Sequence, residues 1–494
     1  MKTLLSLLLC LALGIAPAVA QKTRKLAADS TITTTGEVTV KGKKFPYSVV
    51  TGTQPVWDED GKAIAALEYT YYERTDVTNR SARPLVISFN GGPGSASVWM
   101  HIAYTGPRIL EIDPEGYPVQ PYGIKENPYS ILDVADIVYV NPVNTGYSRI
   151  LIKDTPKEKF FGVNADIKYL AEWLNNFVTR KNRWTSAKYL IGESYGTTRV
   201  SGLALELQNS HWMYLNGVIL VSPTDLGIER GGPVDAALNV PYFAAAAWYH
   251  KMLPPDLQAK DLTDLLPEVE EFTLNELIPG LSRGGFITDQ KRKELAAKMA
   301  RYSGMSEKII LQHNLDVPAQ FFWKELLREK GGYTIGRLDS RYKGIDAKEA
   351  GVSPDYNSEL TSWLHSFTPA INYYLREVLK YKTDIKYNMF GPVNPWNRDG
   401  DNTGKNLRLA MAENPYLNVM FQSGYYDGAT QYFNAKYTMW QIDPSGKMKD
   451  RFSFKGYRSG HMMYLRAEDL VTANEDIRQF ILKTTPKKGE PAKY

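Results

Sequence analysis

Short apolar runs separated by helical patterns constrain the fold of this chain most strongly. Between several of these runs, apolar residues recur at helical spacing, as in 167–177 and 200–207. Strands that alternate with helices predict a mostly parallel sheet with helices on both faces. The runs with the length and composition of buried strands are 85–89, 137–140, 189–191, 218–221 and 419–421.

Other parts of the chain depart from this pattern. Residues 31–74 alternate polar and apolar side chains around turn residues, which predicts antiparallel strands before the parallel sheet. Residues 226–385 are rich in helix formers, so we expect an inserted helical cap. The core is then expected to occupy 21–225 and 386–482, and the lysine-rich tail 483–494 is expected to be disordered.

The N-terminus carries the three parts of a secretory signal. Met1-Lys2-Thr3 is a short basic segment, residues 4–15 are apolar, and Ala18-Val19-Ala20 is a small-residue cleavage site. Pro17 interrupts an apolar run that is already too short to span a bilayer. We therefore expect removal of residues 1–20, a periplasmic or extracellular location, and no membrane span elsewhere.

The composition indicates a folded protein with a modest positive charge. The chain has 494 residues, 59 Lys and Arg against 54 Asp and Glu, and 12% aromatic residues. A formal charge of +5 over this length is too small to indicate a nucleic-acid or membrane-surface partner. No H-E-x-x-H sequence or cluster of His and Cys predicts a metal site, and no cofactor is expected.

Residues 192–196 form a candidate nucleophile motif. Gly192-Glu193-Ser194-Tyr195-Gly196 fits G-x-S-x-G between a predicted strand and a predicted helix. Small flanking residues let the backbone turn sharply and expose the serine hydroxyl, while the helix N-terminus supplies amide donors. We therefore predict that Ser194 is a nucleophile. The alternative for the same pentapeptide is a helix-capping serine.

A nucleophilic serine needs a base and a carboxylate that orients the base. Hydrolases of this architecture have the chain order Ser, Asp or Glu, then His, which favours His461, the last of six histidines. Asp427 follows the predicted strand 419–421 and precedes His461. Asp450 also satisfies this order, but its polar turn favours a solvated side chain.

A tetrahedral intermediate needs two converging amide donors. The residue after the nucleophile, Tyr195, is expected to supply one of them. The glycine-rich loop 90–94, which follows the predicted strand 85–89, is expected to supply the other. The alternatives for this loop are a plain glycine-rich turn and a phosphate loop; the second fails because no Gly-Lys-Ser/Thr follows.

Six motifs that occur in order resemble the serine carboxypeptidase family, the S10 peptidases. They are Asn90-Gly-Gly-Pro-Gly94, Asn127-Pro-Tyr-Ser130, Val140-Asn-Pro-Val143 with Thr145-Gly-Tyr-Ser148, Gly192-Glu-Ser-Tyr-Gly196, Gly424-Tyr-Tyr-Asp427 and Gly460-His-Met462. The resemblance spans residues 90–462. It implies an α/β-hydrolase fold with a helical insertion and hydrolysis of C-terminal residues from peptides with a free C-terminus, through an acyl-enzyme.

The resemblance also implies the roles of individual residues. Ser194 is the nucleophile, His461 the general base and acid, and Asp427 its orienting partner. Gly92 and Tyr195 supply the oxyanion amides. Asn90, Glu193 and the Gly91 amide hold the terminal carboxylate of the substrate. A protonated Glu193 can donate a hydrogen bond to that carboxylate, whereas an ionised one repels it.

Three features depart from the family's pattern. Many members have a second glutamate where this chain has Tyr104, and losing that like charge predicts a less raised Glu193 pKa and activity less confined to acid. Ser95 replaces a common cysteine. Val140 and Asn144 replace a common aspartate and glycine in the D-x-P-x-G-x-G motif, which affects the local loop only.

Two rival classes use or keep the same site: an acyltransferase or esterase, and a binding protein without catalysis. Asn90 and Glu193 favour the peptidase, because an acyltransferase has no terminal carboxylate to bind.

The single cysteine, Cys10, lies in the segment expected to be removed. The mature protein is then expected to have no cysteine, whereas eukaryotic secretory members of the family commonly carry disulfides. We therefore expect a bacterial-type exported member. Its cap is expected to be held by packing alone and to be more mobile than the core.

Overall fold

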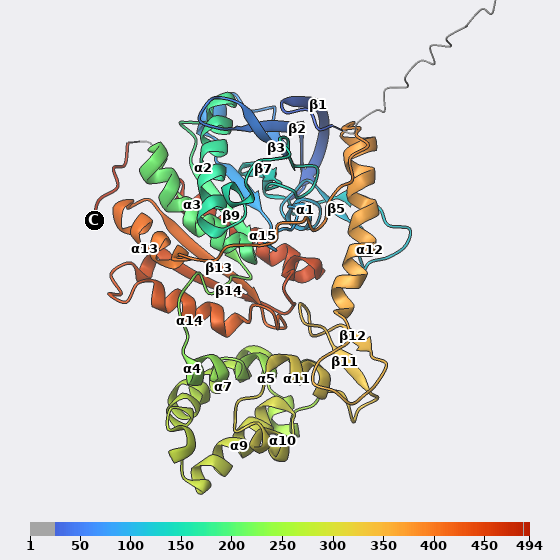
Figure 1. Cartoon of the computed structure of the whole chain (residues 1–494), viewed down its shortest axis with the longest axis vertical. Coiled ribbons are helices and arrows are strands. Elements are labelled where there is room, and N and C mark those ends of the chain that lie inside the picture. The colour runs from blue at the N-terminus through green and yellow to red at the C-terminus, as the bar shows by residue number, and fades with distance from the viewer. Residues whose placement is uncertain (1–24, 488) are drawn as a thin grey trace, which may run out of the picture.

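A computed structural model describes residues 25–487 and 489–494 and contains a ten-stranded sheet (Figure 1). The strand order is β1-β2-β3-β7-β4-β9-β10-β13-β14, with β8 paired to β3. The strands are β1 (Ser30–Val40), β2 (Lys43–Trp57), β3 (Ala63–Arg74), β4 (Leu85–Phe89), β7 (Asp136–Val140), β8 (Arg149–Ile150), β9 (Lys188–Glu193), β10 (Gly217–Val221), β13 (Asn418–Gly424) and β14 (Phe452–Tyr457). The expected signal peptide, residues 1–20, lies outside the described residues.

The sheet has an antiparallel and a parallel part. The pairs β1-β2, β2-β3 and β3-β7 are antiparallel, and every pair from β7 through β4, β9, β10 and β13 to β14 is parallel. This mixed, mostly parallel sheet with antiparallel N-terminal strands confirms the predicted α/β-hydrolase fold. Because parallel strands end at a common edge, the loops that follow β4, β9, β10, β13 and β14 meet there.

The parallel strands are buried on both faces, which explains their continuous apolar sequences. In β4, Val86 packs into one core cluster, whereas Leu85 and Ile87 pack into the cluster on the opposite face. The first cluster includes α1 (Val98–Ala103), α12 (Ser358–Tyr373) and α15 (Ala467–Thr484). The second includes α2 (Val163–Arg180), α3 (Tyr195–His211), α13 (Thr403–Glu413) and α14 (Tyr432–Ile442).

A helical region lies between β10 and α12, and Figure 1 shows its green and yellow helices below the sheet. Its helices are α4 (Gly232–Ala237), α5 (Val240–Tyr249), α6 (Pro255–Gln258), α7 (Leu262–Phe272), α8 (Ile278–Leu281), α9 (Asp289–Ser303), α10 (Glu307–Gln312) and α11 (Ala319–Glu325). They share an apolar cluster of their own, in which Phe243 and Phe322 stack at 4.2 Å.

Two short hairpins were not predicted from the sequence. One pairs β11 (Tyr333–Ile335) with β12 (Lys343–Ile345) in the helical region, and the other pairs β5 (Arg108–Leu110) with β6 (Ile124–Glu126). Strands of three residues are too short to show a period of two. From the first hairpin, α12 returns the chain along the core (Figure 1).

Part of the C-terminal tail contacts the core of the protein. After α15, the amide of Ala492 donates to the Tyr416 hydroxyl at 3.0 Å.

Among residues 25–487 and 489–494, no helix has the length and apolar character needed to cross a bilayer.

Glu68, a buried carboxyl of β3, is expected to make stability depend on pH. It accepts a hydrogen bond from the Asn141 side-chain amide, and burial raises its pKa to about 7. Between pH 4.5 and 7 the native state therefore binds more protons than the unfolded chain, and stability falls as pH rises. In the Glu68→Gln variant, the free energy of unfolding measured with urea should fall less between pH 4.5 and 7, by on the order of 2–3 kcal/mol. Identical slopes in both proteins would contradict this assignment.

Candidate active site

Ser194 lies at the sharp turn between β9 and α3. Its backbone has φ 57° and ψ −127°, a conformation that L residues rarely adopt. The turn also requires its glycines, because a Cβ on Gly192 would collide with the backbone of Gly196. Ser194 makes no side-chain capping hydrogen bond to α3, so the helix-capping alternative fails. The strained turn instead presents the hydroxyl at the carboxyl edge of the sheet.

His461 and Asp427 form a buried pair at the same edge. His461 Nδ1 lies 2.7 Å from Asp427 Oδ2, with exposed fractions of 5% and 0%. Asp427 Oδ1 accepts from the amides of Ala429 and Thr430 at 2.8 and 3.0 Å, and the Thr430 hydroxyl donates to Oδ2. The carboxylate therefore favours a proton on Nδ1, which leaves Nε2 as the basic nitrogen.

The environment of His461 favours its charged form on balance. Burial lowers its pKa, but the charge and hydrogen bond of Asp427, with the charge of Glu193, raise it above the ordinary value. His461 and Ser194 line one cavity of about 390 Å³. Asp450, the alternative partner on sequence order, lies in a separate turn, Lys449–Arg451, and does not line this cavity.

A loop of the helical region, residues 337–341, holds the two loops that carry His461 and Asp427. The His461 amide donates to Leu338 O at 2.6 Å, and the Gly428 amide donates to Arg337 O at 2.9 Å. The buried Arg341 reinforces the loop through Asp339 at 2.7 Å and Ser459 at 2.9 Å. The role of this loop could not be predicted, because nothing in its local sequence distinguishes it from other polar turns.

Glu193 is buried directly before Ser194 and lines the same cavity. Its Oε2 accepts from Asn90 Nδ2 at 3.0 Å and from the Tyr464 hydroxyl. Burial raises its pKa to about 7, against the opposing effects of His461, Tyr464 and Asn90. The carboxyl is therefore protonated below neutral pH, where it can donate a hydrogen bond.

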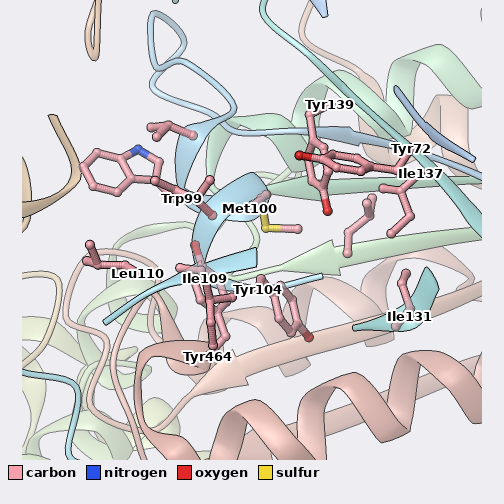
Figure 2. Packing of buried hydrophobic residues seen from close by; sticks show 14 of the residues in the cluster. Tyr72, Trp99, Met100, Tyr104, Ile109, Leu110, Ile131, Ile137, Tyr139 and Tyr464 are labelled. Atoms are coloured by element: carbon pink, nitrogen blue, oxygen red, sulfur yellow. The ribbon is translucent and has the colours of Figure 1, made fainter. Parts of the chain in front are cut away.

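Two aromatic side chains, Tyr464 and Tyr104, lie near Glu193. Tyr104 stacks on Tyr464 with ring centroids 4.5 Å apart (Figure 2) and donates to Gln422 Oε1 at 2.8 Å. The contact between Tyr464 and Glu193 was not predicted from the sequence. The raised pKa of Glu193 thus has burial, not a neighbouring carboxylate at residue 104, as its main cause.

The glycine loop after β4 lies against the turn that carries Ser194. A Cβ on Gly91 would collide with the Tyr195 amide nitrogen, and Gly92 has φ 105°, which favours glycine. The buried Arg199 holds this loop by donating to Asn90 O at 2.7 Å while it pairs with Asp166 at 2.6 Å. The close approach places the backbones of the two segments side by side, as an oxyanion site built from both of them requires.

Comparison with known proteins finds similarity over part of the chain. The family model for serine carboxypeptidases matches residues 56–273. Serine carboxypeptidase-like 16 of Arabidopsis thaliana is 29% identical over 208 residues, 39% of this chain and 44% of that protein. Serine carboxypeptidase-like 11 of the same plant is 25% identical over 202 residues, with 40% and 44% covered. The matches span less than half the length of these curated relatives.

A solved structure supports the fold over a longer stretch. Kex1(delta)p, a prohormone-processing carboxypeptidase from Saccharomyces cerevisiae, superposes on 88% of this chain and 91% of that chain with a TM-score of 0.51 and 16% identity.

The parallel sheet and the serine turn define an α/β hydrolase with the site of a serine hydrolase. Residues 56–273 are similar to the serine carboxypeptidase family. The curated relatives named above are plant proteins and give no support to the expected bacterial-type membership. In the described part of the chain, no group of three or more His, Cys, Asp or Glu residues is arranged to hold a metal ion.

Proposed function

We propose that this protein is a serine-type carboxypeptidase that hydrolyses the last peptide bond of peptides with a free C-terminus. The observation that carries the proposal is the buried pair of Glu193 and Asn90 beside Ser194 in one cavity. A protonated carboxyl and a side-chain amide are hydrogen-bond donors suited to a carboxylate. A peptide that continues beyond this point would have no charge to offer them.

The proposed reaction follows from the arrangement of the catalytic groups. Ser194 Oγ attacks the carbonyl carbon of the last peptide bond while His461 Nε2 takes its proton. The amides of Gly92 and Tyr195 stabilise the oxyanion, and His461 returns the proton to the leaving amino group. Water, deprotonated by His461, then hydrolyses the acyl-enzyme. Asp427 keeps the imidazole oriented throughout.

The first test follows the products released from one longer peptide. Mass spectrometry should show loss of single residues from the C-terminus of the free peptide, with no internal cleavage. An amidated copy of the same peptide should remain intact. Cleavage of both copies would indicate a broader esterase or endopeptidase, and transfer of the acyl group to an added alcohol in preference to water would indicate an acyltransferase.

Protonation of Glu193 is expected to set the alkaline limit of substrate binding. Its pKa is raised to about 7, so above that pH the ionised carboxylate repels the substrate's terminal carboxylate. We expect KM to rise by up to about tenfold per pH unit above 7. Glu193→Gln keeps a neutral donor, so its KM should stay level between pH 6 and 8.5.

A wild-type KM that does not change through pH 7 would contradict this role of Glu193. The expectation that Tyr104 makes the enzyme less acid-limited remains a prediction. A profile as confined to acid as that of paired-glutamate members would refute it.

We also propose that the protein is exported after cleavage near Ala20. The support is the basic, apolar and small-residue pattern of residues 1–20. N-terminal sequencing of protein recovered outside the cytoplasm should begin at Gln21.

A further inference from the structure

Two arginines line the active-site cavity with guanidinium groups that contact no carboxylate in the described part of the chain. Arg337 and Arg398 are both exposed and both lie in the cavity wall. Among residues 25–487 and 489–494, neither guanidinium forms an ion pair or a hydrogen bond. Nearby arginines differ: Arg341 pairs with Asp339, and Arg199 pairs with Asp166.

Among the residues that line the cavity, Glu193 is the one acidic side chain. Glu193 accepts hydrogen bonds from Asn90 and Tyr464. Because its pKa is raised to about 7, its carboxyl is largely protonated at lower pH. Glu359, whose charge acts on Arg337, accepts from the Leu338 amide at 2.7 Å, and burial raises its pKa to about 7. The wall near Ser194 is therefore net positive.

The backbones that carry these arginines are anchored on two sides of the catalytic centre. Arg337 belongs to the loop 337–341, which the His461 and Gly428 amides fix through backbone hydrogen bonds. Arg398 follows Trp396, whose indole nitrogen donates to the Tyr195 hydroxyl at 3.1 Å. Arg337 thus comes from the loop that is hydrogen-bonded to His461. Arg398 comes from the segment that is hydrogen-bonded to Tyr195, the residue after Ser194.

One part of the cavity wall is apolar and contrasts with the two charged arginines. Trp99 of α1 packs on Phe367 of α12 at 4.6 Å, and it lines the cavity with Leu360, Trp363 and Phe390. These apolar side chains give a carboxylate no donor. An acidic substrate side chain in this cavity therefore has two cationic partners, Arg337 and Arg398. Guanidinium binds carboxylate with directional, charge-assisted hydrogen bonds.

We propose that Arg337 and Arg398 select peptides with Asp or Glu at one of the two residues that flank the cleaved bond. This inference rests on the proposed carboxypeptidase function. The terminal carboxylate goes to Asn90 and Glu193, so the arginines act on a second negative charge, that of the side chain. A lysine at the same position is repelled by the same groups.

Two series of N-blocked dipeptides test the proposal. One series varies the C-terminal residue and the other varies the residue before it, with Glu, Gln and Lys at each position. We expect kcat/KM for Glu to exceed that for Gln by about three- to tenfold in at least one series, with Lys lowest. The preference should shrink as NaCl is raised, because salt screens exposed charges.

Variants assign the preference to the two arginines. In Arg337→Gln or Arg398→Gln, the Glu-to-Gln ratio should fall toward one. Arg283→Gln is the matched control, since Arg283 is an exposed arginine of the helical region that does not line the cavity, and its ratio should equal that of the wild type. Labelling of Ser194 by a fluorophosphonate checks that each variant is folded.

Two results would overturn the proposal: equal rates for Glu and Gln in both series, or arginine variants that slow Glu and Gln substrates equally. The second result would mean that the arginines do not act on the side chain of the substrate. Failure to cleave any free-acid dipeptide would instead refute the carboxypeptidase function itself.

Discussion

Ser194→Ala should lower kcat by about four to six orders of magnitude, as expected for loss of the attacking atom. The strained turn at Ser194 presents the hydroxyl in the cavity that His461 also lines. His461→Ala should cost a similar factor. Because both residues act in one proton transfer, the double variant should be no slower than either single variant.

The matched control is Ser95→Ala. Ser95 lines the same cavity, but its hydroxyl donates to Ala96 O and accepts from the Trp99 indole nitrogen. We expect its kcat to fall less than tenfold. Initial rates on one blocked dipeptide check all four variants. More than about 1% residual activity in purified Ser194→Ala protein would contradict nucleophilic attack by Ser194.

Asp427→Asn should lower kcat by about 10⁴ at neutral pH, because it forces the wrong tautomer on His461. Asp427 Oδ1 accepts from two backbone amides, those of Ala429 and Thr430. An asparagine will keep its carbonyl oxygen at that position, so its amide nitrogen faces His461 Nδ1. The imidazole must then accept at Nδ1 and carry its proton on Nε2, where it can no longer deprotonate Ser194.

Asp450→Asn separates this effect from a general loss of acidic charge. Asp450 satisfies the same chain order but lies in the turn Lys449–Arg451, so its replacement should change kcat less than twofold. Thermal unfolding of both variants shows whether either change disturbs the fold. Equal losses of activity in the two variants would contradict the pairing of Asp427 with His461.

The elements predicted well from the sequence are those with a local cause. β4, β9 and β10 are buried on both faces, so their apolar runs identify them without knowledge of their neighbours. The turn at Ser194 needs glycines on both sides, which the pentapeptide displays. For these reasons the sheet, and the candidate positions of Ser194 and His461, could be read before the structure was known.

The features that were missed depend on contacts between distant segments. Tyr464 reaches Glu193 across 271 residues of sequence, and Arg341 reaches Ser459 across 118. Such contacts leave no periodicity or short motif in either segment. The same is true of Arg337 and Arg398, which look like ordinary surface residues until the fold brings them to one cavity.

We propose that Glu193 and Asn90 bind a free terminal carboxylate for attack by Ser194. The ratio of kcat/KM for a blocked dipeptide with a free C-terminus to that for its C-terminal amide, measured at pH 6, tests this binding. Two charge-assisted hydrogen bonds to the carboxylate predict a ratio of at least about a hundredfold. Equal values for the acid and the amide would contradict the claim.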